Sequence, residues 1–333
     1  MAKKEKKSWF RFFDYNRDLR PDAPEEDTRP TVKRYFKLLG RRFWKLISLN
    51  LMMLPMIAPV MIAIWLYLGI SQTPTANSPI FSTLYGVNLI ESTPASTFLL
   101  DLYGLQLGVP VYGVGTYVGM GICAAFLALT FGWQNVGVTY ILRSMVRGEP
   151  VFLFSDYFYA IKRNLKEGFL LGLLDFAAIF LLAFDISYFW SRTDSFWLDV
   201  GFFGIIALII LYFFMRFYLY LMLVTFDISI RKLLKNALIF AVLGIKRNLM
   251  AVLGIVCITA IHVCLFFLFS MTPLGIAIPL ILPLLYYFSF TAFTCAYAAY
   301  PVIERYMIDP YRKADAEETS DGAEPAPDGN ADV

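Results

Sequence analysis

Residues 198–226 read LDVGFFGIIALIILYFFMRFYLYLMLVTF, and Asp199 and Arg216 are the only charged side chains among these 29 residues. A helix of about 20 apolar residues crosses the roughly 30 Å hydrocarbon core of a bilayer, because it rises about 1.5 Å per residue. We therefore predict that this stretch is a transmembrane helix.

Five further apolar stretches of similar length occur along the chain. The 333 residues are 58% hydrophobic and 17% charged, with a mean hydropathy of +0.60. A soluble domain carries about 25% charged residues, so this composition favours a chain that lipid surrounds, with six spans. The other five stretches are residues 46–70, 113–133, 169–190, 249–269 and 274–299.

Lys and Arg residues lie almost entirely on one side of these spans. Of the 29 Lys and Arg residues, 27 precede the first span, follow the last span, or fall in the connections 134–168 and 227–248. Arg192 alone lies on the other side, and Arg216 lies within a span. Cytoplasmic connections of membrane proteins carry an excess of Lys and Arg. We therefore expect a multi-pass protein of the bacterial plasma membrane with both termini in the cytoplasm.

The six spans pair into three hairpins, and a similar basic segment precedes each. The segments 35–46, 157–168 and 240–251 read YFKLLGRRFWKL, YFYAIKRNLKEG and FAVLGIKRNLMA. On a helical wheel their charged residues share one face, which predicts amphipathic helices at the cytoplasmic interface, facing anionic lipid headgroups. Ordinary positively charged flanks without a recognition role are the alternative. The basic pairs are Arg41 and Arg42, Lys162 and Arg163, and Lys246 and Arg247.

The predicted fold is thus an all-α membrane protein in which a helix–hairpin unit occurs three times. A cytoplasmic arm precedes the units, and an acidic tail rich in Pro, Gly and Ala, expected to be disordered, follows them. The arm is residues 1–30, the units are 31–142 (with a long outer connection at 71–112), 143–226 and 227–313, and the tail is 314–333.

Residue types that commonly serve catalysis or metal binding are scarce. His262 is the only histidine, and a helical wheel turns it away from Cys257, which disfavours a metal site. All four cysteines fall in apolar stretches, where they behave as small packing residues. The phosphate-binding motif G-x-x-x-x-G-K-[ST] does not occur. We expect no enzyme activity, catalytic residue, metal or cofactor, and no nucleic-acid partner.

Two charges lie deep within predicted spans. Asp175 and Arg216 fall on antiparallel spans at depths that differ by only about 5 Å. Because an isolated charge at this depth costs at least about 2.5 kcal/mol, we predict that the two side chains form an ion pair. A structural role is favoured over a substrate or proton site.

Glycines and prolines interrupt several spans. Gly115 with Gly119, and Gly168 with Gly172, have the small-xxx-small spacing that lets helices approach closely. Prolines in the first and sixth spans favour packing kinks over the broken helices of transporters. These prolines are Pro55, Pro59, Pro279 and Pro283, and Asn50 adds a polar group near the inner side.

Residues 132–168, GWQNVGVTYILRSMVRGEPVFLFSDYFYAIKRNLKEG, resemble the YesL-like family, uncharacterised membrane proteins of Gram-positive bacteria. The resemblance extends to most of the chain except the outer connection at 71–112 and the acidic tail. It implies an accessory role in carbohydrate uptake or its regulation, next to transporter permease subunits, and assigns no catalytic residue. The matching residues are Gly132, Gly137, Thr139, Tyr140, Leu142, Arg143, Ser155, Asp156, Tyr157, Ala160, Lys162 and Asn164.

The leading expectation is therefore a non-enzymatic membrane protein that is accessory to carbohydrate transport. The alternative is a transporter or channel that uses the intramembrane polar residues. An intramembrane enzyme has little support, since so few acid–base groups are present.

Overall fold

A computed structural model describes residues 29–68, 72–74, 113–190, 195–270 and 277–312, together with a few positions between 90 and 110. The described chain is helical apart from one short antiparallel pair, β1 (Gln72–Pro74) with β2 (Gly108–Pro110). The predicted N-terminal arm up to residue 28, most of the outer connection and the acidic tail lie outside the described residues.

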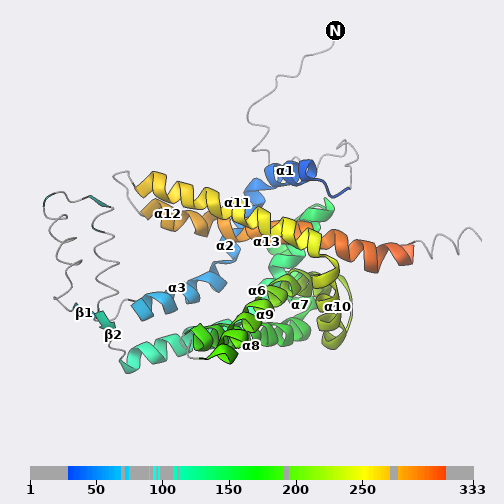
Figure 1. The fold of residues 1–333 in the computed structure, drawn as a ribbon. Coiled ribbons are helices and arrows are strands. Elements are labelled where there is room, and N and C mark those ends of the chain that lie inside the picture. The colour runs from blue at the N-terminus through cyan, green and yellow to red at the C-terminus, as the bar shows by residue number, and fades with distance from the viewer. Residues whose placement is uncertain are drawn as a thin grey trace, which may run out of the picture.

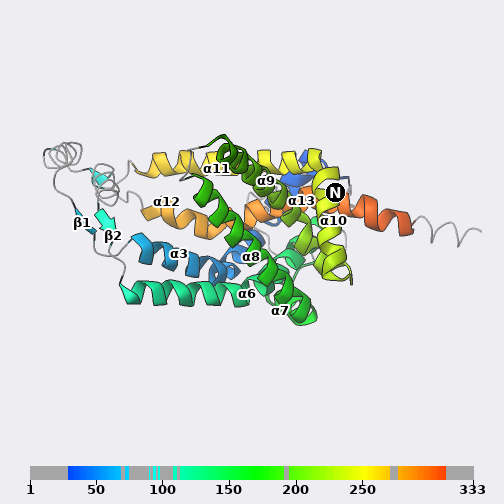
Figure 2. The same cartoon turned by 60° about the horizontal axis from the view of Figure 1, so that its bottom comes forward.

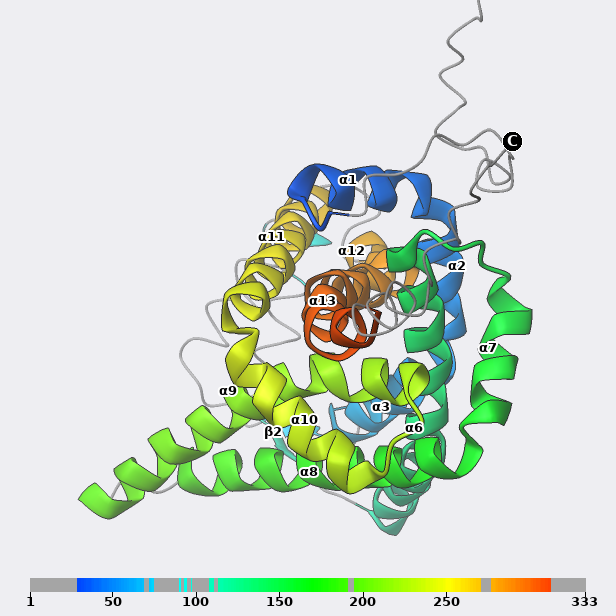
Figure 3. The ribbon, with the colours of Figure 1, turned by 90° about the vertical axis from the view of Figure 1, so that its right-hand side faces the viewer.

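The long helices run side by side, and α13 occupies the centre of the bundle when it is viewed end-on (Figures 1, 2 and 3). Its residues Phe293, Ala299 and Ile303 are fully buried. The elements in chain order are α1 (Val32–Arg41), α2 (Phe43–Met52), α3 (Leu54–Leu68), α6 (Val114–Arg147), α7 (Leu153–Arg163), α8 (Leu165–Trp190), α9 (Phe196–Thr225), α10 (Ile230–Leu243), α11 (Ile245–Ser270), α12 (Ala277–Leu282), the π-helical turn η3 (Pro283–Tyr287), α13 (Phe288–Ile303) and the π-helical turn η4 (Glu304–Ile308).

Four of these helices, α6, α8, α9 and α11, are long and apolar enough to cross a membrane. The pair α2 and α3 makes a fifth candidate, bent by 54° at its break. The second predicted span continues beyond the interface, because α6 is one helix of 34 residues. It ends at Gly148, whose positive φ of 82° is typical of a glycine that terminates a helix.

Short amphipathic helices precede three of the apolar helices, with one intervening residue in each case. These residues are Arg42 between α1 and α2, Asn164 between α7 and α8, and Gly244 between α10 and α11. The third break comes earlier than the sequence alignment implied, so Lys246 and Arg247 belong to the first turn of α11. Gly244 is required there, because a Cβ atom would overlap the hydroxyl of Tyr218.

The predicted lipid-facing role of Arg42 is wrong. Its side chain is 1% exposed, and its guanidinium reaches the connection between α6 and α7. Arg34 and Lys45 donate to backbone carbonyls in the same region. The acceptor of Arg34 belongs to the last turn of α6, whose carbonyls lack helical partners, and the other two acceptors belong to the connection that follows. Arg34 Nη2 donates to the Val146 carbonyl at 3.1 Å, Arg42 Nη2 to that of Glu149 at 2.9 Å, and Lys45 Nζ to that of Val151 at 3.4 Å.

Arg143 closes the end of another helix in the same manner. Its Nη1 donates to the carbonyl of Val224, in the last turn of α9, at 2.7 Å. The C-terminal ends of α6 and α9 are thus joined through an arginine rather than through apolar contacts alone.

Backbones of α6 and α8 meet at glycines. A Cβ atom on Gly132 would overlap the carbonyl oxygen of Gly168, and one on Gly172 would overlap the backbone of Gly132. The predicted close approach at Gly168 and Gly172 is therefore confirmed. Of the other predicted pair, only Gly119 lies at a close contact, because a Cβ there would overlap the Leu66 side chain, whereas a Cβ on Gly115 meets nothing within 4 Å.

The breaks in the first and last apolar stretches meet at Asn50. Its Nδ2 donates to the carbonyls of Pro283 and Leu284 at 3.2 and 2.6 Å, and its Oδ1 accepts from the backbone N–H of Ser289 at 2.7 Å. A π-helical turn leaves such backbone groups without their usual helical partners. The buried side chain of Asn50 satisfies them and ties α2 to η3.

Replacing Gly132 by Ala should destabilise the fold, while Gly121→Ala in the same helix should not, because a Cβ on Gly121 meets nothing within 4 Å. Overpacking typically costs about 1–3 kcal/mol, whereas Ala favours a helix over Gly by up to about 1 kcal/mol. Thermal unfolding of the detergent-solubilised variants measures the difference. Equal stability of the two variants would contradict the close contact.

Candidate intramembrane polar site

Asp175 of α8 and Arg216 of α9 lie in contact. Arg216 Nε lies 3.0 Å from one carboxylate oxygen of Asp175 and 3.2 Å from the other. The Asp175 side chain is fully buried, whereas that of Arg216 is 32% exposed. The structure thus brings together the two charges that the sequence placed at similar depths.

Two tyrosines complete the surroundings of this carboxylate. Tyr212 donates its hydroxyl to Asp175 Oδ1 at 2.6 Å, and Tyr220 donates to Oδ2 at 2.9 Å. They lie four residues before and four residues after Arg216, so all three side chains share one face of α9. Sequence reasoning missed both tyrosines, although their spacing about Arg216 was the available signal. Asp175 therefore accepts hydrogen bonds from three side chains of a single helix.

The glycine contact between α6 and α8 positions this cluster. Gly168, Gly172 and Asp175 recur at intervals of four and three residues, which places them along one stripe of α8. Phe131, next to Gly132 on α6, lies against the Arg216 guanidinium, whose Cζ is 5.6 Å from the ring centroid. Close packing of the two helices thus brings an aromatic face and a carboxylate to the same arginine.

Arg216 also lines a cavity of about 330 Å³ where α3, α6, α9, α11 and α13 meet. Its two terminal nitrogens donate no hydrogen bond to the described residues. Asp175 does not line this cavity, so the accessible part of the ion pair is cationic. Other polar side chains at the cavity are Asn135, Thr139, Tyr220, Tyr287 and Thr291.

Such an arrangement suits the binding of a small anion or of a strong hydrogen-bond acceptor. Guanidinium donors form short, strong hydrogen bonds with carboxylate and phosphate oxygens. The Asp175 carboxylate accepts hydrogen bonds from Tyr212, Arg216 and Tyr220, and it holds the Arg216 guanidinium in place. This geometry favours a positioned cation over a carboxylate that exchanges protons with the cavity.

Most of the predicted interfacial cations remain at the protein surface. Lys162, Arg163 and Lys246 are exposed, while Arg41 and Arg247 are half-buried. No hydrogen bond or ion pair joins any of the six to Asp175 or Arg216, so the basic pairs and the intramembrane cluster are separate sites.

His262 packs against two tyrosines of η3. Its Nδ1 lies 3.1 Å from the hydroxyl of Tyr286, and its ring lies near those of Tyr286 and Tyr287. Within the described residues, no group of three His, Cys, Asp or Glu side chains could hold a metal ion.

Comparison with protein-family models, with curated proteins and with solved structures gives no match. The resemblance to the YesL-like family therefore depends on the sequence motifs alone.

Asp175→Leu should destabilise the fold by about 3 kcal/mol, at the lower end of the range for breaking a buried ion pair, since the guanidinium is partly open. The double variant Asp175→Leu/Arg216→Leu should recover much of this loss, because no unpaired charge remains. Asp199→Leu, at the exposed start of α9, should change stability by less than about 1 kcal/mol. Thermal unfolding in detergent checks the series, and a double variant as unstable as the single one would refute the pair's structural role.

Proposed function

We propose that this protein spans the bacterial plasma membrane six times, with both termini in the cytoplasm, and acts as a non-enzymatic accessory subunit of a carbohydrate-uptake system. The bent pair α2–α3 supplies the first span. The uninterrupted helical run from α12 through η3 to α13 supplies the sixth and completes three hairpins. The placement of Lys and Arg supports the orientation, and the resemblance to the YesL-like family supports the uptake system.

The observation that carries the accessory role is the α8–α9 hairpin. Beyond Asp175 on α8, and before Phe214 on α9, neither helix has a buried residue. Figure 3 shows this part of the hairpin extending away from the other helices. The distal part of α9, residues 196–213, is about 27 Å long at 1.5 Å per residue. It offers a membrane-embedded surface that the other described helices leave uncovered.

Two features of this surface favour protein partners over lipid alone. A Cβ on Gly204 would meet nothing within 4 Å, and small residues are where transmembrane helices approach one another. Asp185, five residues before the end of α8, is half-buried and has no partner among the described residues. Carboxylates within membrane helices normally pair with a polar group. Transmembrane helices of permease subunits would supply both contacts.

Gly204→Phe tests this surface, because the new ring projects into open space and should leave the protein's own fold intact. We expect the variant to lose at least tenfold of the co-purifying permease subunits from mild detergent. Gly115→Phe is the matched control, since Gly115 is equally open but lies on α6, and it should retain them. Two outcomes would reject the accessory role at this hairpin. In the first, both variants still recover the permease subunits; in the second, neither the variants nor the natural chain recovers them.

A second function, transport of a small anion, is favoured by the cavity at Arg216. This cavity presents the open side of the guanidinium and is lined by Met53 and Tyr287, which belong to the breaks in the first and last apolar stretches. Transporters bind substrates at interrupted helices of this kind. The two broken stretches and a positioned cation thus meet at one place.

Uptake of radiolabelled phosphate and chloride into liposomes that contain only this protein distinguishes the two functions. A transporter should give flux above protein-free liposomes, and Arg216→Gln should abolish it, because the anion loses its cationic contact. Lys235→Gln removes an exposed cation of α10 and should preserve the flux. Absence of flux with the natural chain would reject phosphate and chloride transport.

A further inference from the structure

A second cavity, of about 480 Å³, forms a groove between α1, α11 and α13. On α11 its wall runs from Arg247 through Met250, Gly254 and Cys257 to Ile261. This spacing of three and four residues places the wall on one face of the helix. From Arg247 to Ile261 the groove extends about 21 Å along the axis, which exceeds half of the roughly 30 Å hydrocarbon core.

Tyrosine side chains, rather than close backbone packing, connect the α1 region to α13, and this spacing leaves the groove open. Tyr35 forms a hydrogen bond with Thr294 Oγ1 at 2.8 Å, and Tyr297 donates to the Thr31 carbonyl at 2.6 Å. The rim is apolar and uncovered, with Phe36 and Leu253 each 64% exposed. In a membrane, such a rim opens sideways toward the acyl chains of the lipids.

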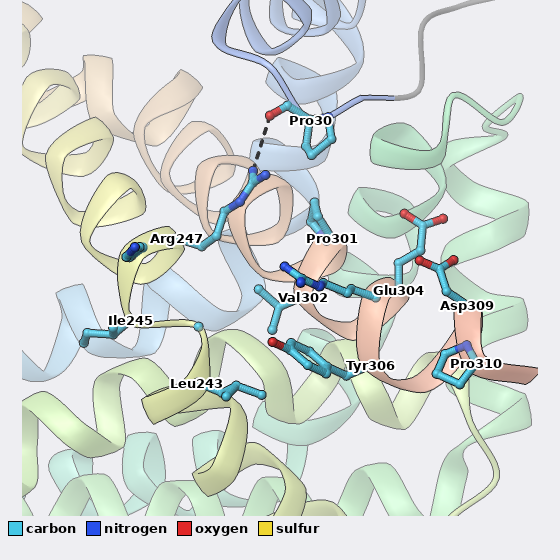
Figure 4. Close-up of a pocket in the computed structure, with 13 residues that line it drawn as sticks. Pro30, Leu243, Ile245, Arg247, Pro301, Val302, Glu304, Tyr306, Asp309 and Pro310 are labelled. Carbon is cyan, nitrogen blue, oxygen red and sulfur yellow. Dashed lines mark hydrogen bonds between the residues drawn. The ribbon is translucent and has the colours of Figure 1, made fainter.

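At its cytoplasmic end the groove adjoins a polar cavity of about 910 Å³, shown in Figure 4. Pro30 and Arg247 line both cavities. Lys246 and Arg305 add two further cations to the polar cavity. The apolar groove therefore ends at a cluster of positive charge.

Arg247 is available to a ligand at this junction. Its one hydrogen bond is a long one, from Nη1 to the Pro30 carbonyl at 3.4 Å, and its other donors have no acceptor among the described residues. Glu304 and Asp309 also line the cavity, on the side away from Arg247 in Figure 4. The Glu304 carboxylate forms an ion pair with Arg312, with 3.8 Å between Oε1 and Nη1, and Arg312 does not line the cavity.

We propose that the two cavities together bind one anionic phospholipid of the cytoplasmic leaflet, with its phosphate at Lys246 and Arg247 and one acyl chain in the groove. The groove has the volume of ordinary small-molecule sites, about 300–1,000 Å³. Basic pockets between transmembrane helices on the cytoplasmic side bind anionic lipid headgroups. This site goes beyond the accessory role and rests only on the proposed orientation, which places Lys246 and Arg247 on the cytoplasmic side of the membrane.

The test of the headgroup contact measures binding of dioleoyl phosphatidylglycerol to the full-length protein by native mass spectrometry from detergent. We expect Lys246→Gln/Arg247→Gln to weaken binding at least tenfold. The matched control is Lys162→Gln/Arg163→Gln, which removes the equivalent exposed pair before α8 and should change binding less than twofold. Equal losses from both double variants would overturn the site in favour of general attraction by basic flanks.

The test of the acyl-chain contact uses two exposed cysteines of α11. Cys257→Trp fills the groove and should weaken binding at least tenfold, whereas Cys264→Trp, outside the groove, should not. Cys264→Trp adds the same ring at another exposed position of the same helix, so a general loss of folding is separated from a loss of binding. Equal binding by the two variants would overturn the assignment of the groove.

Ligand competition separates a phospholipid from other occupants. Phosphatidylcholine, which carries no net charge, should bind at least tenfold more weakly, and inorganic phosphate should compete only at concentrations far above those of the lipid. Phosphate that displaces the lipid at equal concentration would overturn the proposal and indicate a free-anion site. Removal of residues 2–28 should leave lipid binding unchanged, and a tenfold gain would instead assign the groove to this arm.

Discussion

Direct contact between the backbones of α6 and α8 is the constraint from which the interior of this protein follows. Gly132 faces Gly168 and Gly172 with no side chain between the helices. Transmembrane helices gain little from the hydrophobic effect when they associate, so packing at small residues and polar contacts carries the energy. The close approach places Phe131 and Asp175 beside Arg216. The orientation of the α8–α9 hairpin and the position of the Arg216 guanidinium at its cavity both depend on this placement.

Helical character, apolar stretches and the depth of the intramembrane charges were accessible from the sequence. These properties depend on local composition and on the fixed rise of a helix. The partners of individual side chains were less accessible, as Arg42 illustrates. It reads as a surface cation in the sequence, yet it is buried against the Glu149 carbonyl, because tertiary packing brings the end of α6 against α1.

The site was also predictable only in part. Depth alone identified Asp175 and Arg216, while the contributions of Tyr212 and Tyr220 required knowledge of which face of α9 meets α8. Similarly, Asn50 was recognisable as a polar residue near the inner side, but its two bonds to η3 and its third bond, to the start of α13, depend on a π-helical turn. Such a turn arises from local backbone conformation, for which proline content is a weak guide.

Arginine and lysine bonds to main-chain carbonyls near the C-terminal ends of α6 and α9 have a chemical property that carboxylate pairs lack. The acceptors at Val146, Glu149, Val151 and Val224 are peptide oxygens, which do not protonate in mild acid. Acidification that neutralises Asp and Glu side chains leaves these acceptors unchanged. The C-terminal ends of α6 and α9 consequently remain anchored in acidic surroundings that would release an assembly based on surface salt bridges.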